Sequence, residues 1–255
     1  MRDPHVEAIY FSVGSSEDIS YENPDPLEFC NHLGAFILKE GVLKVIPAEH
    51  FRSGADANMA LEGFLRSWEI EADIKRNVGM IRFSYTRADV IDRDPPPTGE
   101  PQFIHAEGFA TVTVSCSASL HLVASRYPEP PERFSATEYA QHAYRRWMNF
   151  RTGREPLQAM AYFVLTLFQK PIGTRADACR HFMVDRDVLN RIGELCSDRG
   201  DIMTARKVDS LTFQELSDIE KKWLETAVKR LIHRMGEQAS GYPVELITMG
   251  SIGQF

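Results

Sequence analysis

The sequence predicts an α+β protein, with an antiparallel sheet and one packed helix in its N-terminal half and a five-helix bundle in its C-terminal half. The main observation is a change of hydrophobic period at the proline-rich segment Tyr127–Phe134. Before it, the readable segments alternate with the period of two that is typical of strands; after it, apolar residues recur at helical spacing. We therefore predict a sheet-rich unit over residues 1–127, a connector over 128–136 and a helical unit with an irregular tail over 137–255.

The charge of the chain divides at the same segment. Residues 1–134 carry 12 Lys and Arg against 21 Asp and Glu, a net charge of −9, whereas residues 135–255 carry 17 against 15, a net charge of +2. Phosphate contacts require clustered Lys and Arg, so the acidic N-terminal half is a poor surface for nucleic acid. RNA or a nucleotide is conceivable in the C-terminal half, but a net charge of +2 does not support it.

Composition indicates an ordinary globular protein. The chain has 255 residues, of which 43% are hydrophobic and 25% charged, both typical of soluble domains. It begins without a basic start and apolar run, and its longest apolar stretch, Met160–Phe168, is too short to cross a bilayer. Cys30, Cys116, Cys179 and Cys196 lack the paired spacing of zinc or redox sites. We expect a bacterial-type cytoplasmic protein with reduced thiols and no membrane partner.

The first elements of the N-terminal half read as strands. Val6–Val13 is apolar and aromatic and is bounded by Gly14 and a polar run. Residues 35–38 and 42–46 flank Lys39-Glu40-Gly41, a short connection whose glycine tolerates a positive φ. These residues predict a first strand followed by a β-hairpin.

Residues 55–75 switch to helical spacing. Their apolar side chains fall on one face at intervals of three and four, and Gly79 is expected to end the helix. The members of that face are Ala57, Leu61, Phe64, Leu65, Trp68 and Ala72.

Two further strands are predicted before the connector. Ile81, Phe83 and Tyr85 alternate with polar residues, and residues 111–122 alternate apolar side chains with hydroxyls over a long run. Between them, the three consecutive prolines in Asp92–Gly99 cannot continue a strand ladder, so this segment is expected to be an exposed loop.

Apolar residues at helical spacing in residues 137–255 predict five helices. Thr137 starts the first, which reaches Phe150, and Pro156 suits the start of the second, which reaches about Gln169. The second is apolar nearly all round, so we expect it at the centre. A short helix over 175–182 and another over 185–196 follow.

The last helix is predicted from a capping box at Thr212–Glu215. An apolar stripe follows, and the tail after Gly241 is expected to be irregular, with a short strand near 244–248. The stripe consists of Leu216, Ile219, Trp223, Ala227, Leu231 and Met235.

Motifs for phosphate, nucleophile or metal chemistry are few. The sequence has no Walker pattern, no glycine fingerprint between a strand and a helix, and no Gly-x-Ser-x-Gly elbow. His105 and Glu107 would share one face of a strand, which suits two metal ligands. No second cluster of ligand residues matches them, so we expect no metal site and no cofactor.

The helix order of residues 137–239 resembles the HEPN family of helical domains. The residues that carry the resemblance lie before the last helix, in Cys196-Ser-Asp-Arg199-Gly-Asp-Ile-Met-Thr-Ala-Arg206-Lys207. In that family, an Arg in this loop is usually followed by a polar residue and, several residues later, a His. Many members are metal-independent ribonucleases whose Arg and His meet across a dimer interface, and others are non-catalytic binding or dimerisation modules.

The resemblance implies a non-catalytic member. Arg199 matches the family's Arg by place, but Ala205 is followed by Arg206 where the His is expected. Without an imidazole, RNA cleavage has no obvious proton carrier. Arg175 and His181 have the family's separation and form an alternative catalytic pair, although Ala176 follows the Arg where a polar residue is usual.

Two basic groups remain as candidate ligand sites. Arg199, Asp201, Arg206 and Lys207 occupy the loop before the last helix, where they either bind a ligand or simply complement helix termini. A second patch contains Arg145 and Arg146 between two aromatic residues; it would bind an anion or nucleotide phosphate, or form a solvated face.

We therefore expect a non-enzymatic sensor or interaction protein of unknown ligand. Its helical domain would dimerise or bind a protein partner, as non-catalytic HEPN-like domains do. The alternative is a metal-independent ribonuclease built on the helical domain. Cleavage of RNA without metal, abolished by His181→Ala, would distinguish the two.

Overall fold

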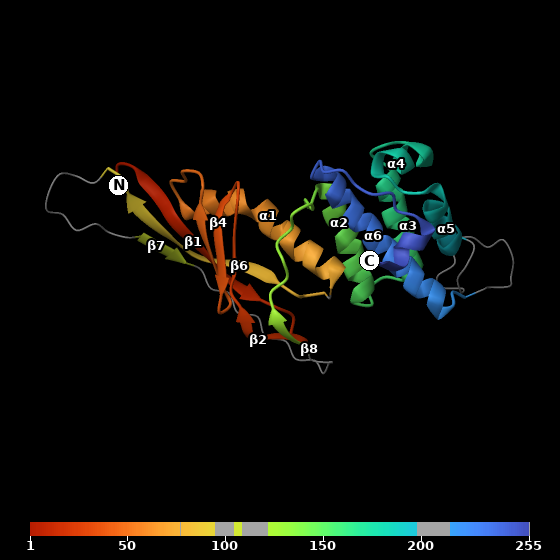
Figure 1. The fold of residues 1–255 in the computed structure, drawn as a ribbon, viewed down its shortest axis with the longest axis horizontal. Helices are drawn as coiled ribbons and strands as arrows, with labels where there is room; N and C mark the ends of the chain where they lie inside the picture. The colour runs from red at the N-terminus through yellow and green to blue at the C-terminus, as the bar shows by residue number, and fades with distance from the viewer. Residues whose placement is uncertain (77, 95–104, 109–121, 198–214, 255) are drawn as a thin grey trace. The chain divides into compact units, whose positions relative to one another are not determined.

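A computed structural model describes residues 1–76, 78–94, 105–108, 122–197 and 215–254 of the chain (Figure 1). The chain divides into two units, Met1–Pro130 and Pro131–Phe255. This boundary falls inside the segment 128–136 that the sequence predicts as a connector. The first unit combines strands with a helix and the second is helical, which confirms the α+β prediction.

The described residues of the first unit contain a six-stranded sheet in the order β3-β4-β5-β1-β6-β7, and every neighbouring pair is antiparallel. β1 lies inside the sheet, with Ile9 opposite Val45 on one side and Ala88 on the other. The strands are β1 Pro4–Gly14, β3 Leu27–Asn31, β4 Gly34–Lys39, β5 Val42–Pro47, β6 Arg82–Asp92 and β7 His105–Gly108.

The predicted hairpin is confirmed as β4 and β5. Glu40 and Gly41 connect the strands, with φ of 51° and 75°. Two successive residues with positive φ define the tight turn whose twist matches a hairpin. Glycine adopts a positive φ without steric cost, whereas Glu40 is a non-glycine residue in this less common conformation.

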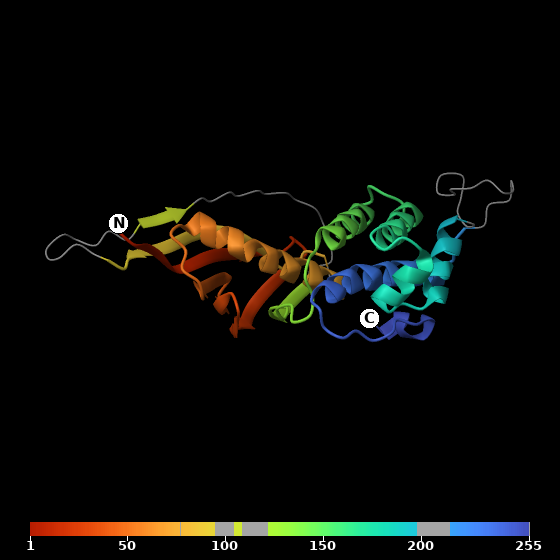
Figure 2. The same cartoon turned by 90° about the horizontal axis from the view of Figure 1, so that it is seen from above.

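Helix α1, Gly54–Lys75, packs on one face of the sheet (Figures 1 and 2). Ser53 caps it by accepting a hydrogen bond from the backbone N–H of Asp56. The apolar face predicted from the sequence is buried in the core, except for Phe64, which is partly buried against it. Trp68 is fully buried, and its indole N–H donates to the Pro128 carbonyl oxygen at 3.0 Å.

The end of α1 differs from the prediction. The helix ends at Lys75, and Gly79 does not terminate it. Instead, the Gly79 N–H donates to the carboxylate of Asp73 at 2.8 Å, while Arg82 Nη2 lies 2.5 Å from the same carboxylate. Since Asp73 is fully buried, this network fixes the start of β6 against the helix.

Neither β2, Ile19–Asp25, nor β3 was predicted from the sequence. β2 pairs in parallel with β8, Leu122–Arg126, to form a second sheet beside the antiparallel one. β2 is polar and irregular, with Asn23 at a φ of 45°. β3 is short, although Leu27 and Phe29 alternate with polar residues as a strand requires.

Two predicted segments lie mainly outside the described residues. Only Leu122 of the predicted strand 111–122 is described, and it begins β8. Asp92–Asp94 are the described part of the predicted loop 92–99, and Asp92 is the last residue of β6.

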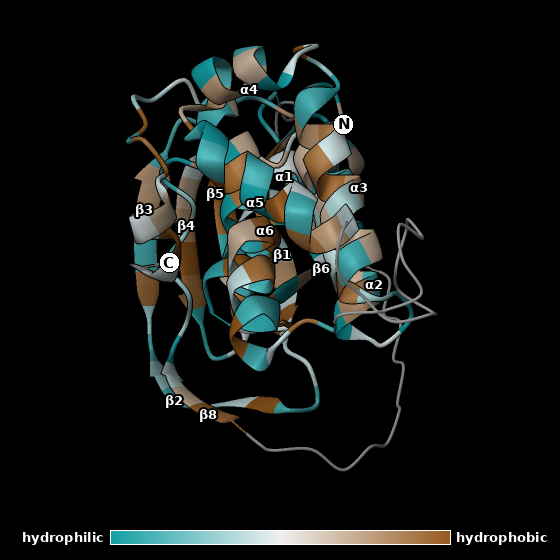
Figure 3. Cartoon of the chain, turned by 90° about the vertical axis from the view of Figure 1, so that its right-hand side faces the viewer, coloured by the Kyte–Doolittle hydropathy of each residue, from teal (hydrophilic) through white to brown (hydrophobic). Residues whose placement is uncertain are grey.

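Five α-helices occupy the described residues of the second unit. The expected central helix is α3, which packs against each of the other four, yet its Phe163 and Leu167 are only half-buried. Figure 3 shows how hydrophobic and hydrophilic residues are distributed over these helices. They are α2 Glu138–Arg151, α3 Leu157–Gln169, α4 Arg175–Phe182, α5 Arg186–Ser197 and α6 Asp218–Ala239, and a 3₁₀ helix, η1 Met249–Gln254, follows.

The capping box of the last helix was assigned to the wrong residues. Ser217 is the N-cap of α6, and Glu220 completes the box by accepting from the Ser217 backbone N–H at 2.9 Å. Thr212 lies outside the described residues. Both Thr212–Glu215 and Ser217–Glu220 fit the sequence pattern, so spacing alone did not distinguish them.

The apolar stripe of α6 also differs in its first turns. Ile219 is 82% exposed rather than buried, and Leu224 and Val228 face the core instead. The second half of the predicted stripe is correct, since Ala227, Leu231 and Met235 are among the buried residues.

The tail packs on the helices through a short backbone contact. Ile247 forms an isolated parallel bridge with Val184, within the segment predicted as a short strand. In the described part of the chain, no helix combines the length and apolar character needed to span a membrane.

Candidate functional site

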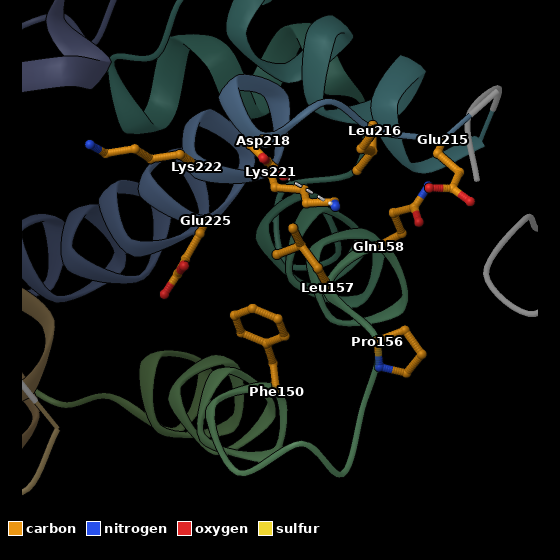
Figure 4. A pocket seen from close by; sticks show the side chains of 10 residues that line it. All are labelled: Phe150, Pro156, Leu157, Gln158, Glu215, Leu216, Asp218, Lys221, Lys222 and Glu225. Atoms are coloured by element: carbon orange, nitrogen blue, oxygen red, sulfur yellow. Dashed lines mark hydrogen bonds and ion pairs between the residues drawn. The ribbon is translucent and has the colours of Figure 1, made fainter. Parts of the chain in front are cut away.

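A cleft of about 500 Å³ opens at the start of α6 (Figure 4). We call it the α6 cleft. It lies between the end of α2, the start of α3 and the first two turns of α6. Its lining residues are Phe150, Pro156, Leu157, Gln158, Glu215, Leu216, Asp218, Lys221, Lys222 and Glu225.

The α6 cleft has an apolar interior. Phe150 lies in the last turn of α2, and Leu157 is the first residue of α3. Leu216 precedes the cap of α6, and only 7% of its surface is exposed. Gln158 is also buried and donates from Nε2 to the Leu195 carbonyl oxygen at 3.1 Å. This hydrogen bond joins the start of α3, which forms one wall of the cleft, to α5.

Charged residues of both signs surround this interior. Lys221 Nζ lies 3.4 Å from the Asp218 carboxylate, and Glu225 accepts from Arg151 Nη1 at 3.0 Å. The described lining contains three carboxylates, two ammonium groups and no arginine. The cleft is therefore suited to an apolar group with polar surroundings, and it lacks the guanidinium fork that favours phosphate.

A second apolar groove of about 400 Å³ lies over α2 and α3. Phe163 and Leu167, one turn apart on α3, line it together with Tyr139 of α2. An adjoining pocket of about 250 Å³ shares Tyr139 and Leu167 and reaches α4 and α6. Phe163 and Leu167 are among the apolar residues of α3 that its neighbouring helices leave partly exposed.

The sheet unit contains a third cleft, of about 650 Å³, beside the β4–β5 turn. Tyr21 and Tyr127 form part of its wall, with ring centroids 4.7 Å apart. The Tyr127 hydroxyl accepts from the Gly41 N–H at 3.0 Å, and the Tyr21 hydroxyl donates to the Met80 carbonyl oxygen. Burial, and then the neighbouring Tyr127, raise the pKa of Tyr21 to about 12, so its hydroxyl stays protonated.

Within one chain, the two residues of the candidate catalytic pair contact different neighbours. Arg175 Nη1 donates to Asn190 Oδ1 on α5 at 3.0 Å. His181 is exposed and meets the edge of the Phe182 ring, with centroids 4.6 Å apart. Residues six apart on a helix point in directions roughly 120° apart. Each side chain therefore contacts a different part of the helical unit.

The candidate anion patch is similarly divided. Arg146 pairs with Glu155, and its guanidinium lies 4.2 Å from the centre of the Phe163 ring. Arg145, the next residue along α2, is exposed. The charge of Arg146 is thus paired within the protein.

The remaining candidates are the four residues before the last helix and the pair His105 and Glu107. Arg199, Asp201, Arg206 and Lys207 fall outside the described residues. His105 and Glu107 belong to β7, and they lie opposite Val90 and Ala88 of β6. Within the described part of the chain, no group of three or more potential metal ligands comes together.

The sequence did not single out the residues of the α6 cleft. A signal was present in Leu216-Ser217, since an apolar residue before a capping box often packs near the helix start. Phe150 and Leu157 carried no such signal, because both fit an ordinary buried position on an amphipathic helix.

Comparison with known proteins gives no relative. No family model, no curated protein and no solved structure matches the chain. The resemblance to the HEPN family therefore remains a prediction from the sequence.

Proposed function

We propose that the protein is a non-enzymatic interaction protein whose helical unit binds a peptide segment of a partner protein in the α6 cleft. The observation that carries this proposal is an apolar interior inside a rim of both charges. Phe150, Leu157 and Leu216 provide a surface for one apolar side chain of the peptide. Lys222 and Glu215 at the rim would meet charged or polar groups on either side of it.

The rim charges favour a peptide over a nucleic acid. Three carboxylates against two ammonium groups give the described lining a net charge of −1. Asp218 and Glu225 are already engaged with Lys221 and Arg151. A polyphosphate would meet this rim with like charges, whereas a peptide of mixed charge would not.

A ribonuclease is the competing function. It would need a base and an electrophile near one reacting phosphate. Within one chain, Arg175 and His181 engage separate neighbours, so their joint action would require the dimer interface across which the two residues meet in the HEPN family. We therefore assign the helical unit a binding role, which is also the role of non-catalytic HEPN-like domains.

A displayed peptide library tests the proposal although the partner is unidentified. Phage carrying random short peptides would be selected on the full-length protein. Enriched peptides should share an apolar residue flanked by charges of both signs. Their binding should fall about ten-fold or more in Leu157→Asp, since loss of an anchor contact typically costs more than about 1 kcal/mol. Aspartate suits the first position of a helix, so α3 should remain intact.

Ile219→Asp is the matched control. Ile219 is a large apolar residue on α6 that is 82% exposed and does not line the cleft. Peptide binding should be unchanged in this variant. If selected peptides bind both variants as they bind the wild type, the cleft is not their site and the proposal fails.

Incubation with structured and single-stranded RNA in the absence of metal tests the competing function. We expect intact RNA. Cleavage that is lost in His181→Ala would overturn the non-enzymatic proposal. Light scattering of the same sample would show whether the protein forms a homodimer, which is the expected form of self-association.

A further inference from the structure

Two histidines of the sheet unit contact each other through ring nitrogens. His5 lies near the start of β1, and His50 lies in the segment between β5 and α1. Their Nδ1 atoms are 3.0 Å apart and their rings are inclined by only 6°. Rings stacked face to face would keep their atoms about 3.5 Å apart or more. The shorter distance indicates an edge-to-edge N–H···N hydrogen bond.

The outer nitrogens of the pair have different partners. Arg93, just after β6, places Nη2 at 2.6 Å from His5 Nε2. On the other side, His50 Nε2 lies 3.5 Å from Asp3 Oδ1. The result is a chain of four side chains in the order Arg93, His5, His50, Asp3, which we call the histidine latch.

The partners determine where the protons lie. A guanidinium only donates, so His5 Nε2 must accept. Neutral His5 then carries its proton on Nδ1 and donates it to His50 Nδ1. Neutral His50 in turn carries its proton on Nε2, the atom that lies 3.5 Å from Asp3 Oδ1. The two contacts of His5, with His50 at 3.0 Å and with Arg93 at 2.6 Å, are both satisfied only when both imidazoles are neutral.

An added proton has no free position in the latch. On His5 it would occupy Nε2 and face the Arg93 N–H. On His50 it would occupy Nδ1 and face the His5 N–H across 3.0 Å. Either site turns an attractive contact into one between two donors. Proton uptake by the pair is therefore coupled to the loss of one contact.

Hydrogen bonds beside the latch join the N-terminal end of β1 to two other segments, the residues before α1 and the end of β6. The Val6 N–H donates to the Phe51 carbonyl oxygen, and the Arg93 N–H donates to that of Asp3, both at 2.9 Å. The Asp92 carboxylate accepts from the N–H groups of Arg2 and Asp3, also at 2.9 Å. Opening the latch would weaken the attachment of the N-terminal end of β1 to both neighbouring segments.

We propose that the histidine latch is a pH-sensitive device that holds the N-terminal end of β1 at neutral pH and releases it on acidification. The proposal is independent of the function assigned to the α6 cleft. Both histidines and their partners belong to the sheet unit.

The surroundings of His5 agree with release of the N-terminal end of β1 on acidification. Burial, followed by the charges of Arg93 and His50, lowers the pKa of His5 from its usual value of 6.5, against the opposing effect of Asp3 and Glu7. The unfolded chain thus takes up a proton more readily than the folded one. The stability that the latch contributes is present above the ordinary imidazole pKa and is lost as the pH falls below it.

Protonation of Asp92 does not explain a loss of stability in the pH range in which imidazoles charge. Hydrogen bonds, first from the Asp3 N–H, lower the pKa of its carboxyl group. It therefore remains ionised between neutral pH and the pH at which the imidazoles charge. The charged and titratable groups around the latch are Asp3 and Glu7 on β1, His50 before α1, Asp92 and Arg93 at the end of β6, and the N-terminal ammonium group.

Hydrogen exchange of the full-length protein tests the device. The protection factors of the Val6 and Arg93 amides should fall about ten-fold or more between about pH 7 and pH 5, the range in which imidazoles charge. Protection factors correct for the change of intrinsic exchange rate with pH. Unchanged protection over this range would overturn the proposal.

Glutamine replacements provide the decisive comparison. An amide accepts and donates like a neutral imidazole but takes up no proton in this range. The double variant His5→Gln/His50→Gln should keep its protection at acid pH. His32→Gln, which changes an exposed histidine between β3 and β4, should lose protection as the wild type does. Equal loss in the double variant would assign the transition to other groups.

Imidazole ¹⁵N chemical shifts provide a second test that needs no variant. At neutral pH we expect a protonated Nδ1 on His5 and a protonated Nε2 on His50. A proton on Nε2 of neutral His5 would contradict the arrangement from which the device is inferred.

Discussion

Arg234 Nη1 donates to the Phe182 carbonyl oxygen at 2.6 Å, so a side chain of α6 binds the end of α4. The same guanidinium donates to the carbonyl oxygens of Met183 and Glu245, at 3.0 and 2.7 Å. Its Nε donates to the Glu237 carboxylate at 2.8 Å. Only 2% of Arg234 is exposed. One buried cation thus joins α6, the α4–α5 turn and the C-terminal tail.

Replacing this arginine should destabilise the helical unit. Arg234→Met would leave the Phe182 and Glu245 carbonyl groups without their donor, and we expect a loss of about 3 kcal/mol in the free energy of unfolding. Urea denaturation measures it. Arg180→Met is the control, because Arg180 is exposed and pairs with Asp177 at the surface, so it should cost less than about 0.5 kcal/mol. Equal losses would contradict the role of Arg234.

The partner of Arg234 makes this unit sensitive to acid. Burial opposes ionisation of Glu237, but the His233 and Arg234 side chains outweigh it and lower the pKa of Glu237 to about 2. A lowered carboxyl pKa contributes stability above the ordinary value of 4.5, and this contribution is lost as the pH falls toward 2.

Glu237→Gln should therefore reduce the slope of the unfolding free energy against pH between 4.5 and about 2. We expect a contribution of roughly 2 kcal/mol after allowance for solvent screening. Glu194→Gln, an exposed carboxylate on α5, should leave the slope unchanged. A wild-type slope in the Glu237 variant would show that another carboxylate is responsible.

Asp73 is a buried carboxylate whose ion pair should stabilise the sheet unit. Asp73→Asn removes the charge that pairs with Arg82 and weakens the acceptor for the Gly79 N–H. Since Asp73 is fully buried, we expect a loss of about 3 kcal/mol. Glu62→Gln, on the exposed face of the same helix, should be nearly neutral. Thermal unfolding of both variants compares them directly.

The sequence predicted those elements whose local pattern and tertiary packing agree. The helical period of residues 55–75 predicts that Trp68 is buried, and the structure buries it. The predicted turn at Glu40-Gly41 joins two paired strands. Ile219 was misplaced because the apolar stripe was extended into the first turn of α6, where an exposed apolar residue costs little.

The candidate sites were harder to predict than the fold. Arg175 and His181 are close in sequence, but helix geometry directs them to Asn190 and Phe182. The α6 cleft and the histidine latch join residues far apart in the chain, such as His5 and Arg93. No spacing rule within one element identifies such a contact, so these sites required the three-dimensional arrangement.

Binding of a library-selected peptide to the α6 cleft tests the central claim most directly. Isothermal titration would compare the wild type with Leu157→Asp and Ile219→Asp, using the most enriched peptide. We predict that Leu157→Asp weakens binding about ten-fold or more, whereas Ile219→Asp binds as the wild type does. Equal affinity for all three proteins would contradict a peptide-binding role for this cleft.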